Sequence, residues 1–292
     1  MNLFSIVEEI EKIDPEFNDR ISPRRDAIKN ITSFGSKVAV AAIPFALGNL
    51  FKKAYGQTAS ASVISVLNFA LTLELLEAGF YNAGIGASGL VTDTAYITQI
   101  QGDENKHVTF LTSAITAAGG TPVTKASFKY VDYTAGSGSM NGPFATVFSN
   151  YTTFLSVALA FEDTGVRAYK GQAPNLLGNQ TYLTAALDIH AVEARHASAI
   201  RYLLSTKGLA ITPWITSTAA NSNDTGISQV DGNYAGATPE NTITQGGVNI
   251  LNLPSATAST TTEATATAAF DEPLTMAEVL TLLVPAFVQL NS

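Results

Sequence analysis

The chain has 292 residues, of which 46% are hydrophobic and 14% are charged, with a formal net charge of −8. Residues 57–292 hold 8 basic and 17 acidic side chains and so carry −9, which argues against nucleic acid as a partner because phosphate binding requires basic patches. The absence of cysteine excludes disulfides, thiolate metal sites and iron–sulfur clusters. Any metal must therefore be held by oxygen and imidazole nitrogen, ligands that suit iron, manganese or zinc.

The first 56 residues have the features of an export segment. Residues 22–29 (SPRRDAIK) are similar to the twin-arginine consensus, and an apolar stretch over residues 38–50 follows. This stretch is shorter than the ~20 residues that span a bilayer but has the length of a signal-peptide apolar region. Residues 54–56 (AYG) offer a small-residue cleavage zone. We expect a periplasmic protein that contacts a membrane only through residues 1–56; the alternative is a cytoplasmic protein with an N-terminal helical hairpin.

The next 150 or so residues contain four helix-compatible runs. The first covers residues 62–86, and the second covers residues 90–118 and is closed by the Gly-Gly-Thr-Pro sequence that follows it, which stops helices. After a Gly- and Ser-rich link, a proline at position 143 can open a third helix, which is expected to reach about residue 171. The fourth run covers residues 179–206. We therefore place one helical domain at residues 57–208, with the link as a long crossover.

The two halves of this domain repeat each other. Residues 70–74 (ALTLE) resemble residues 158–162 (ALAFE), and residues 104–107 (ENKH) resemble residues 193–196 (EARH). The single Glu precedes the Glu-x-x-His pair by 30 residues in the first half and by 31 in the second. Two helical hairpins related by duplication predict an all-α, antiparallel four-helix bundle.

The repeated residues predict a two-metal site. Residues three apart on a helix share a face, so each Glu-x-x-His pair directs a carboxylate and an imidazole to one place. A single Glu from each of the other two helices completes the ligand set of carboxylate-bridged metal pairs in helical bundles. The apolar sequence around each single Glu supports this, because burying an uncompensated carboxylate is costly. The predicted ligands are Glu74, Glu104, His107, Glu162, Glu193 and His196, holding two ions of iron or, alternatively, manganese.

Four further residues lie near these ligands in the sequence. Glu77 is a rival to Glu74, but the duplication matches it with Gly165, so we expect it to be close to the site without binding metal, or solvated. His190 precedes Glu193 by one turn and is expected to form hydrogen bonds near the site. Tyr81 and Tyr169 each follow a single Glu by seven residues, about 10 Å along the axis. They are either core tyrosines with satisfied hydroxyls, or donors or redox relays that act on the metals.

The C-terminal region, residues 209–292, differs in composition from the bundle. Residues 209–269 are rich in Thr, Ala, Ser, Asn and Gly and predict extended coil that wraps the bundle or stays mobile, with residues 256–268 flexible. A Thr and a Glu three residues apart then form a capping box. It opens a helix expected over residues 276–290 and kinked at Pro285, which would pack on the bundle or on a second subunit of a homodimer.

The pattern of residues 67–81 together with the two Glu-x-x-His pairs resembles the ferritin-like superfamily, most of all the exported branch of plant desiccation-related and fungal stress-response proteins. The resemblance implies a ferritin-like bundle with ferroxidase, oxygenase, manganese catalase or reductase chemistry. We therefore expect a di-metal protein that oxidises iron or handles oxygen or peroxide in stress protection. The alternatives are a metal-free structural or stress protein and a manganese catalase-like enzyme. The export segment and the long tail argue against a storage cage.

Overall fold

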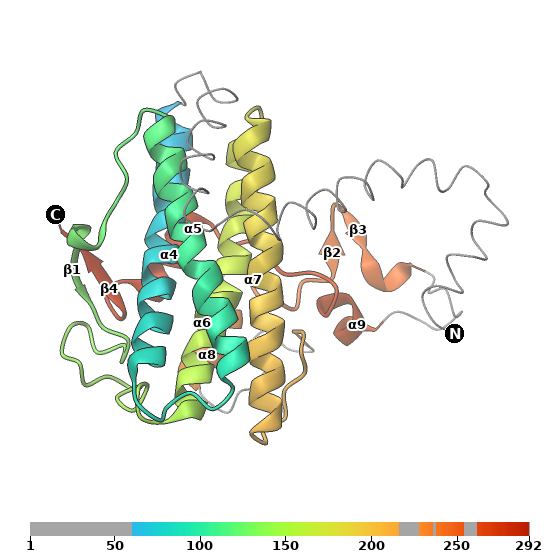
Figure 1. Cartoon of the computed structure of the whole chain (residues 1–292). Helices are drawn as coiled ribbons and strands as arrows, with labels where there is room; N and C mark the ends of the chain where they lie inside the picture. Colours follow the sequence, from blue (N-terminus) through green and yellow to red (C-terminus); the bar gives the residue numbers. More distant parts are fainter. Residues whose placement is uncertain (1–59, 216–227, 236–237, 254–261, 292) are drawn as a thin grey trace, which may run out of the picture. The chain divides into compact units, whose positions relative to one another are not determined.

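The computed structural model describes residues 60–215, 228–235, 238–253 and 262–291, so the predicted export segment lies outside the described residues. All described residues belong to one compact unit. Four long helices dominate this unit (Figure 1): α4 (Ala61–Gly86), α5 (Thr94–Ala117), α6 (Tyr151–Gln172) and α7 (Gln180–Thr206).

Local sequence signals set the ends of these helices. Ser60, Asn150 and Asn179 cap α4, α6 and α7, because each side-chain oxygen accepts a hydrogen bond from the backbone N–H three residues on, which satisfies a donor that the first turn leaves free. Gly119 and Gly208 follow α5 and α7 with φ of 81° and 94°, the left-handed conformation that ends many helices. The two glycines occupy matching places in the duplication.

The helices form two hairpins, α4 with α5 and α6 with α7, and these are the most extensive helix pairs. Figure 1 shows that α4 and α6 run in opposite directions. A side chain at Gly84, near the end of α4, would collide with the ring of Phe154 near the start of α6, with a closest approach of 2.2 Å. A long crossover joins α5 to α6 and carries strand β1 (Phe128–Val131). The predicted all-α, antiparallel four-helix bundle with a long crossover is confirmed.

The core consists of two apolar clusters with the predicted ligands between them. The first is rich in aromatic residues and includes Phe80, Phe154 and Leu203; the second includes Leu71 and Ile115. On α5 and α7 the predicted ligand residues separate the members of one cluster from the members of the other. Among the described residues, α4 is the helix long and apolar enough to span a membrane, and most of it is buried within the bundle.

The third helix begins later than its sequence predicts. Pro143 was expected to open it, but α6 starts at Tyr151 behind its Asn150 cap. Residues 143–149 form turns in which Phe144 and Val147 are buried, and Phe144 donates its backbone N–H to the carbonyl of Thr134. Packing of these two side chains against the bundle therefore overrides a start signal that is sterically acceptable by itself.

The last helix is shorter than predicted. Helix α10 (Met276–Leu283) has the expected capping box: the hydroxyl of Thr275 accepts from the Glu278 N–H at 3.2 Å, and Glu278 accepts from the Thr275 N–H at 2.7 Å. The expected continuation to residue 290 is wrong, because Pro285 has no N–H and ends the helix rather than kinking it. Strand β4 (Val288–Leu290) then pairs antiparallel with β1.

The rest of the tail is more ordered than predicted. It contains α8 (Ser228–Asp231), a hairpin of β2 (Thr244–Gln245) and β3 (Val248–Asn249), and α9 (Glu263–Thr267). Part of the stretch expected to be flexible is thus helical, with Ala266 and Thr267 of α9 buried; residues 254–261 lie outside the described residues.

Helix α6 anchors the tail through a buried arginine. The Arg167 guanidinium pairs with Glu240 at 2.6 Å and donates to the carbonyls of Asn233 and Glu272. The backbone of Leu274 donates to the carbonyl of Arg167, and any side chain at Gly171 would meet the Leu274 carbonyl oxygen at 1.9 Å. The tail therefore packs on the bundle of its own chain.

A second buried pair joins α6, α7 and the tail. Arg201 of α7 pairs with Asp163 of α6, and Tyr234 donates its hydroxyl to the same carboxylate. Arg201 and Asp163 are only 1% and 3% exposed, so removing one partner would strand a buried charge. Sequence reasoning did not foresee either arginine, because their acidic partners are distant in the chain.

Candidate metal centre

The six predicted ligands meet in the middle of the bundle, one from α4, one from α6 and two each from α5 and α7. The four glutamates are fully buried, while His107 and His196 are 8% and 5% exposed. The imidazole rings lie 6.3 Å apart between their centroids. The structure thus brings together every residue of the predicted ligand set: Glu74, Glu104, His107, Glu162, Glu193 and His196.

The first potential metal position is surrounded by one histidine and three carboxylates. The Nδ1 atom of His107 lies 3.1 Å from Glu74 Oε2, 3.2 Å from Glu104 Oε2 and 3.1 Å from Glu193 Oε1. One ligand atom from each of these four residues falls within 4.8 Å of all the others, which is the compactness that a single ion requires.

The second position repeats the first through the duplication. The Nδ1 atom of His196 lies 2.8 Å from Glu104 Oε1, 3.3 Å from Glu162 Oε2 and 3.8 Å from Glu193 Oε2. These four residues also satisfy the 4.8 Å limit. Glu104 and Glu193 belong to both groups and direct one oxygen to each histidine, as carboxylates that bridge two ions would.

Several buried oxygen and nitrogen atoms of the cluster lack hydrogen-bond partners, as expected of atoms that bind metal ions. Five of its buried atoms make no hydrogen bond: Glu104 Oε1, Glu162 Oε2, both carboxylate oxygens of Glu193, and His196 Nδ1. Buried polar atoms are normally paired, and four carboxylates neutralise two divalent cations. The donor set of imidazole nitrogen and carboxylate oxygen suits iron, manganese or zinc.

The comparison with protein families agrees with this geometry. The family model described as "Ferritin-like domain" matches residues 62–206, which cover the four long helices and all six ligands. Residues 62–206 form a ferritin-like domain. No curated protein and no solved structure matches the chain significantly.

Two tyrosines of the ferritin-like domain form hydrogen bonds with Glu74 and Glu162, the two carboxylates that each belong to a single ligand group. Tyr81 of α4 donates its hydroxyl to Glu162 Oε1 of α6, and Tyr169 of α6 donates to Glu74 Oε1 of α4, each at 2.5 Å. Helical side chains lean toward the N-terminus, so each tyrosine reaches back to the centre and meets the glutamate of the opposite helix. Spacing within one helix had placed each hydroxyl two turns from its own glutamate and so missed this exchange.

The two imidazoles carry the positive charge of the site in the metal-free protein. Burial opposes protonation, but the surrounding carboxylates outweigh it and raise the pKa of both His107 and His196 far above its ordinary value. Burial likewise raises the pKa of Glu193, but the positively charged imidazoles of His107 and His196 beside it lower it to about 2. Protons on the histidines thus compete with metal ions, so metal binding must release protons.

Three carboxylates, those of Glu74, Glu77 and Glu162, resist ionisation when no metal is bound. Burial, followed by repulsion from Glu193, raises the pKa of Glu74 and of Glu77. Burial also raises the pKa of Glu162, against the attraction of His196. Their ionised forms therefore require the positive charge of bound metal ions.

Glu77 lies beside the site but belongs to neither ligand group. It is 3% exposed, so the alternative of a solvated side chain is wrong. A side chain at Gly165 would lie 3.5 Å from Glu77 Oε1 and 3.7 Å from Glu193 Oε2. Gly165, which matches Glu77 in the duplication, therefore packs directly against this fifth carboxylate, at a distance where a Cβ would make ordinary van der Waals contact.

Two more polar residues lie close to the histidine ligands. His190 Nδ1 is 3.0 Å from the carbonyl oxygen of Val166, and His190 is in neither ligand group. Asp103 Oδ2 lies 3.6 Å from His196 Nε2, on the opposite side of the ring from the carboxylates, and favours the tautomer that leaves Nδ1 free for metal. The sequence signal for Asp103 was its position directly before Glu104, which no prediction used.

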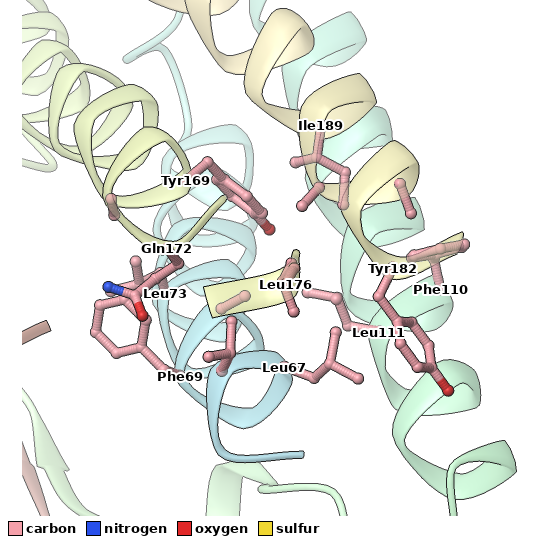
Figure 2. A pocket seen from close by; sticks show the side chains of 15 residues that line it. Leu67, Phe69, Leu73, Phe110, Leu111, Tyr169, Gln172, Leu176, Tyr182 and Ile189 are labelled. Atoms are coloured by element: carbon pink, nitrogen blue, oxygen red, sulfur yellow. The ribbon is translucent and has the colours of Figure 1, made fainter. Parts of the chain in front are cut away.

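A small apolar cavity lies at the Tyr169 end of the site, between α4, α5, α6 and α7. Its volume is about 20 Å³, room for a single water-sized group. Figure 2 shows the ring of Tyr169 directed from α6 into the cavity, with Leu67, Leu111 and Ile189 among the surrounding side chains. The apolar lining keeps this side of the site dry.

Proposed function

We propose that the ferritin-like domain is an oxidoreductase that holds two iron ions and uses them to oxidise ferrous iron or to reduce oxygen or peroxide. The observation that carries the proposal is the pair of ligand groups that share Glu104 and Glu193. Two iron ions so placed would supply a pair of electrons to one oxygen species. Manganese suits the same ligands and is the alternative metal.

The residues of the chain would serve this chemistry in distinct ways. His107 and His196 would each bind one ion, and Glu74 and Glu162 would complete the two ligand sets. Tyr81 and Tyr169 hold these two carboxylates in position by hydrogen bonds, which fixes their oxygens toward the metals. The full burial of the four glutamates excludes bulk water and strengthens the electrostatic interactions at the site.

The test begins with full-length protein freed of metal by a chelator and loaded anaerobically with two equivalents of ferrous iron. Oxygen or hydrogen peroxide is then added, and oxygen uptake and the absorbance of ferric iron are followed. We expect rapid oxidation of two ferrous ions per chain. Glu104→Gln, which removes a shared ligand, should abolish the reaction, whereas Asn105→Gln, an exposed change on the same helix, should not alter it.

The other outcomes identify the alternatives. Vigorous peroxide dismutation with manganese and weak activity with iron would indicate a manganese catalase-like enzyme. Failure to bind any metal would indicate a structural or stress protein that keeps only the bundle. Either outcome would reject the iron-based proposal.

Export through the twin-arginine route remains part of the proposal, with a role in stress protection outside the cytoplasm. Its support is the residue pattern around Arg24 and Arg25. Cell fractionation should find the protein in the periplasm, and the double variant Arg24→Lys/Arg25→Lys should retain it in the cytoplasm. Equal distribution of both forms would show that these arginines do not direct export.

A further inference from the structure

A groove between α5 and α7 leads from the surface to the outer edge of His196. Its volume is about 580 Å³, within the range of pockets that bind small organic molecules. At its floor lie His196 and Asp103, its walls include Ile100, Val192 and Ala199, and its rim includes Tyr96, Gln99 and Arg195. The imidazole of His196 therefore stands between the groove and the predicted metal position.

The duplication places residues of different size at the matching positions of the two halves of the bundle. The offset that aligns Glu104 with Glu193 also aligns Phe110 with Ala199. Phe110 lines the small apolar cavity of about 20 Å³ on the His107 side, whereas Ala199 lines the groove of about 580 Å³ on the His196 side. A small residue thus replaces a large one where the groove opens.

The chemistry of the lining selects an aromatic molecule with hydroxyl groups. Tyr96 at the rim is 46% exposed and offers aromatic surface to a ligand. Its ring centroid lies 6.2 Å from that of Tyr202, which is 47% exposed outside the groove lining. Arg195 is exposed beside them, and guanidinium groups stack on aromatic rings. At the floor, Asp103 accepts from Gln99 at 2.7 Å and from Lys106 at 2.8 Å, which leaves lone pairs to accept from a ligand hydroxyl.

We propose that this groove binds a small dihydroxybenzene of the hydroquinone class, one imidazole ring away from the metal pair. A molecule bound there would be close enough to act as a reductant of the proposed di-iron site. This redox role rests on the proposed function, whereas binding of the molecule to the groove does not. Oxidation of a hydroquinone to its quinone releases two electrons, which match the two ferric ions left by the proposed reaction, and two protons, which the open groove passes to solvent.

Binding can be measured without any redox reaction by loading the full-length protein with zinc, which does not change oxidation state. Saturation-transfer NMR and calorimetric titration with hydroquinone under anaerobic conditions should show one site per chain. Ala199→Phe, which places on α7 the residue found at the matching position of α5, should weaken binding at least tenfold. Ala191→Phe adds the same bulk to an exposed position on α7 outside the groove lining and should leave the affinity unchanged.

Folding of each variant is checked by helix content and by a zinc stoichiometry equal to that of the parent protein. If Ala199→Phe fails this check, Ala199→Leu takes its place, with a smaller expected loss of affinity. Equal hydroquinone affinity in the parent and in the folded variant would overturn the proposal. Binding of cyclohexanol as tight as that of hydroquinone would also overturn it, because the groove would then not select aromatic rings. Failure of the iron reaction leaves the zinc result intact, so the two proposals can fail separately.

Discussion

Raising the pH from 7 to 8 should destabilise the metal-free ferritin-like domain. In the native protein the pKa values of His107 and His196 are raised far above the ordinary value, whereas in the unfolded chain both imidazoles titrate near 6.5. The stabilisation from these protons is complete below pH 6.5 and is lost as the pH rises toward the native pKa values. Between pH 7 and 8 these two imidazoles hold about two more protons in the native state than in the unfolded state, and the raised pKa values of the buried Glu74, Glu77 and Glu162 add to this excess.

Each excess proton lowers the free energy of unfolding by about 1.4 kcal/mol per pH unit, so two protons lower it by about 2.7 kcal/mol. Glu240, whose pKa burial raises to about 8, adds to the loss in the same window. Glu193, with its pKa lowered to about 2, contributes stability that is complete above pH 4.5 and therefore constant here. The net slope across this window is negative.

Urea unfolding of chelator-treated protein at several pH values between 6.5 and 8.5 measures this slope. The double variant His107→Gln/His196→Gln should lose most of it, and metal-loaded protein should not show it, because bound ions replace the protons. A free energy of unfolding that stays constant or rises with pH in the metal-free protein would refute the charge distribution derived for the site.

Three further changes test other parts of the structure. Glu193→Gln should reduce metal content from two ions per chain to fewer than one by elemental analysis, whereas Glu77→Gln should keep both ions; equal losses would place Glu77 among the ligands. Tyr81→Phe and Tyr169→Phe should each cost about 1–3 kcal/mol in urea unfolding of the metal-free protein, because each leaves a buried carboxylate oxygen without its donor; no cost would show that these bonds do not form. Arg201→Met should cost about 3–5 kcal/mol by stranding a buried carboxylate and should speed proteolysis of the C-terminal region; unchanged resistance to protease would contradict the anchoring role.

The ligand set could be predicted because both of its signals are local. The i, i+3 spacing of Glu104 and His107 and of Glu193 and His196 places each pair on one helix face, and the duplication selected Glu74 over Glu77. The capping box of α10 was also readable, since it depends on two residues three apart.

What the sequence did not predict depends on segments that are distant in the chain. The late start of α6 follows from the packing of Phe144 and Val147. The tail is held on the bundle by contacts that involve Arg167 and Arg201, whose carboxylate partners lie on other elements. Local patterns carry no information about such partners.

The sequence by itself determined the four helices, the duplication and the six predicted ligand residues. Only the tertiary structure decided that Tyr81 binds the glutamate of α6 and Tyr169 that of α4, because the exchange requires the two helices to run in opposite directions. It also decided that the groove opens at Ala199 and not at the matching Phe110. Helical periodicity fixes which residues share a face, whereas contacts between helices depend on how those faces are brought together.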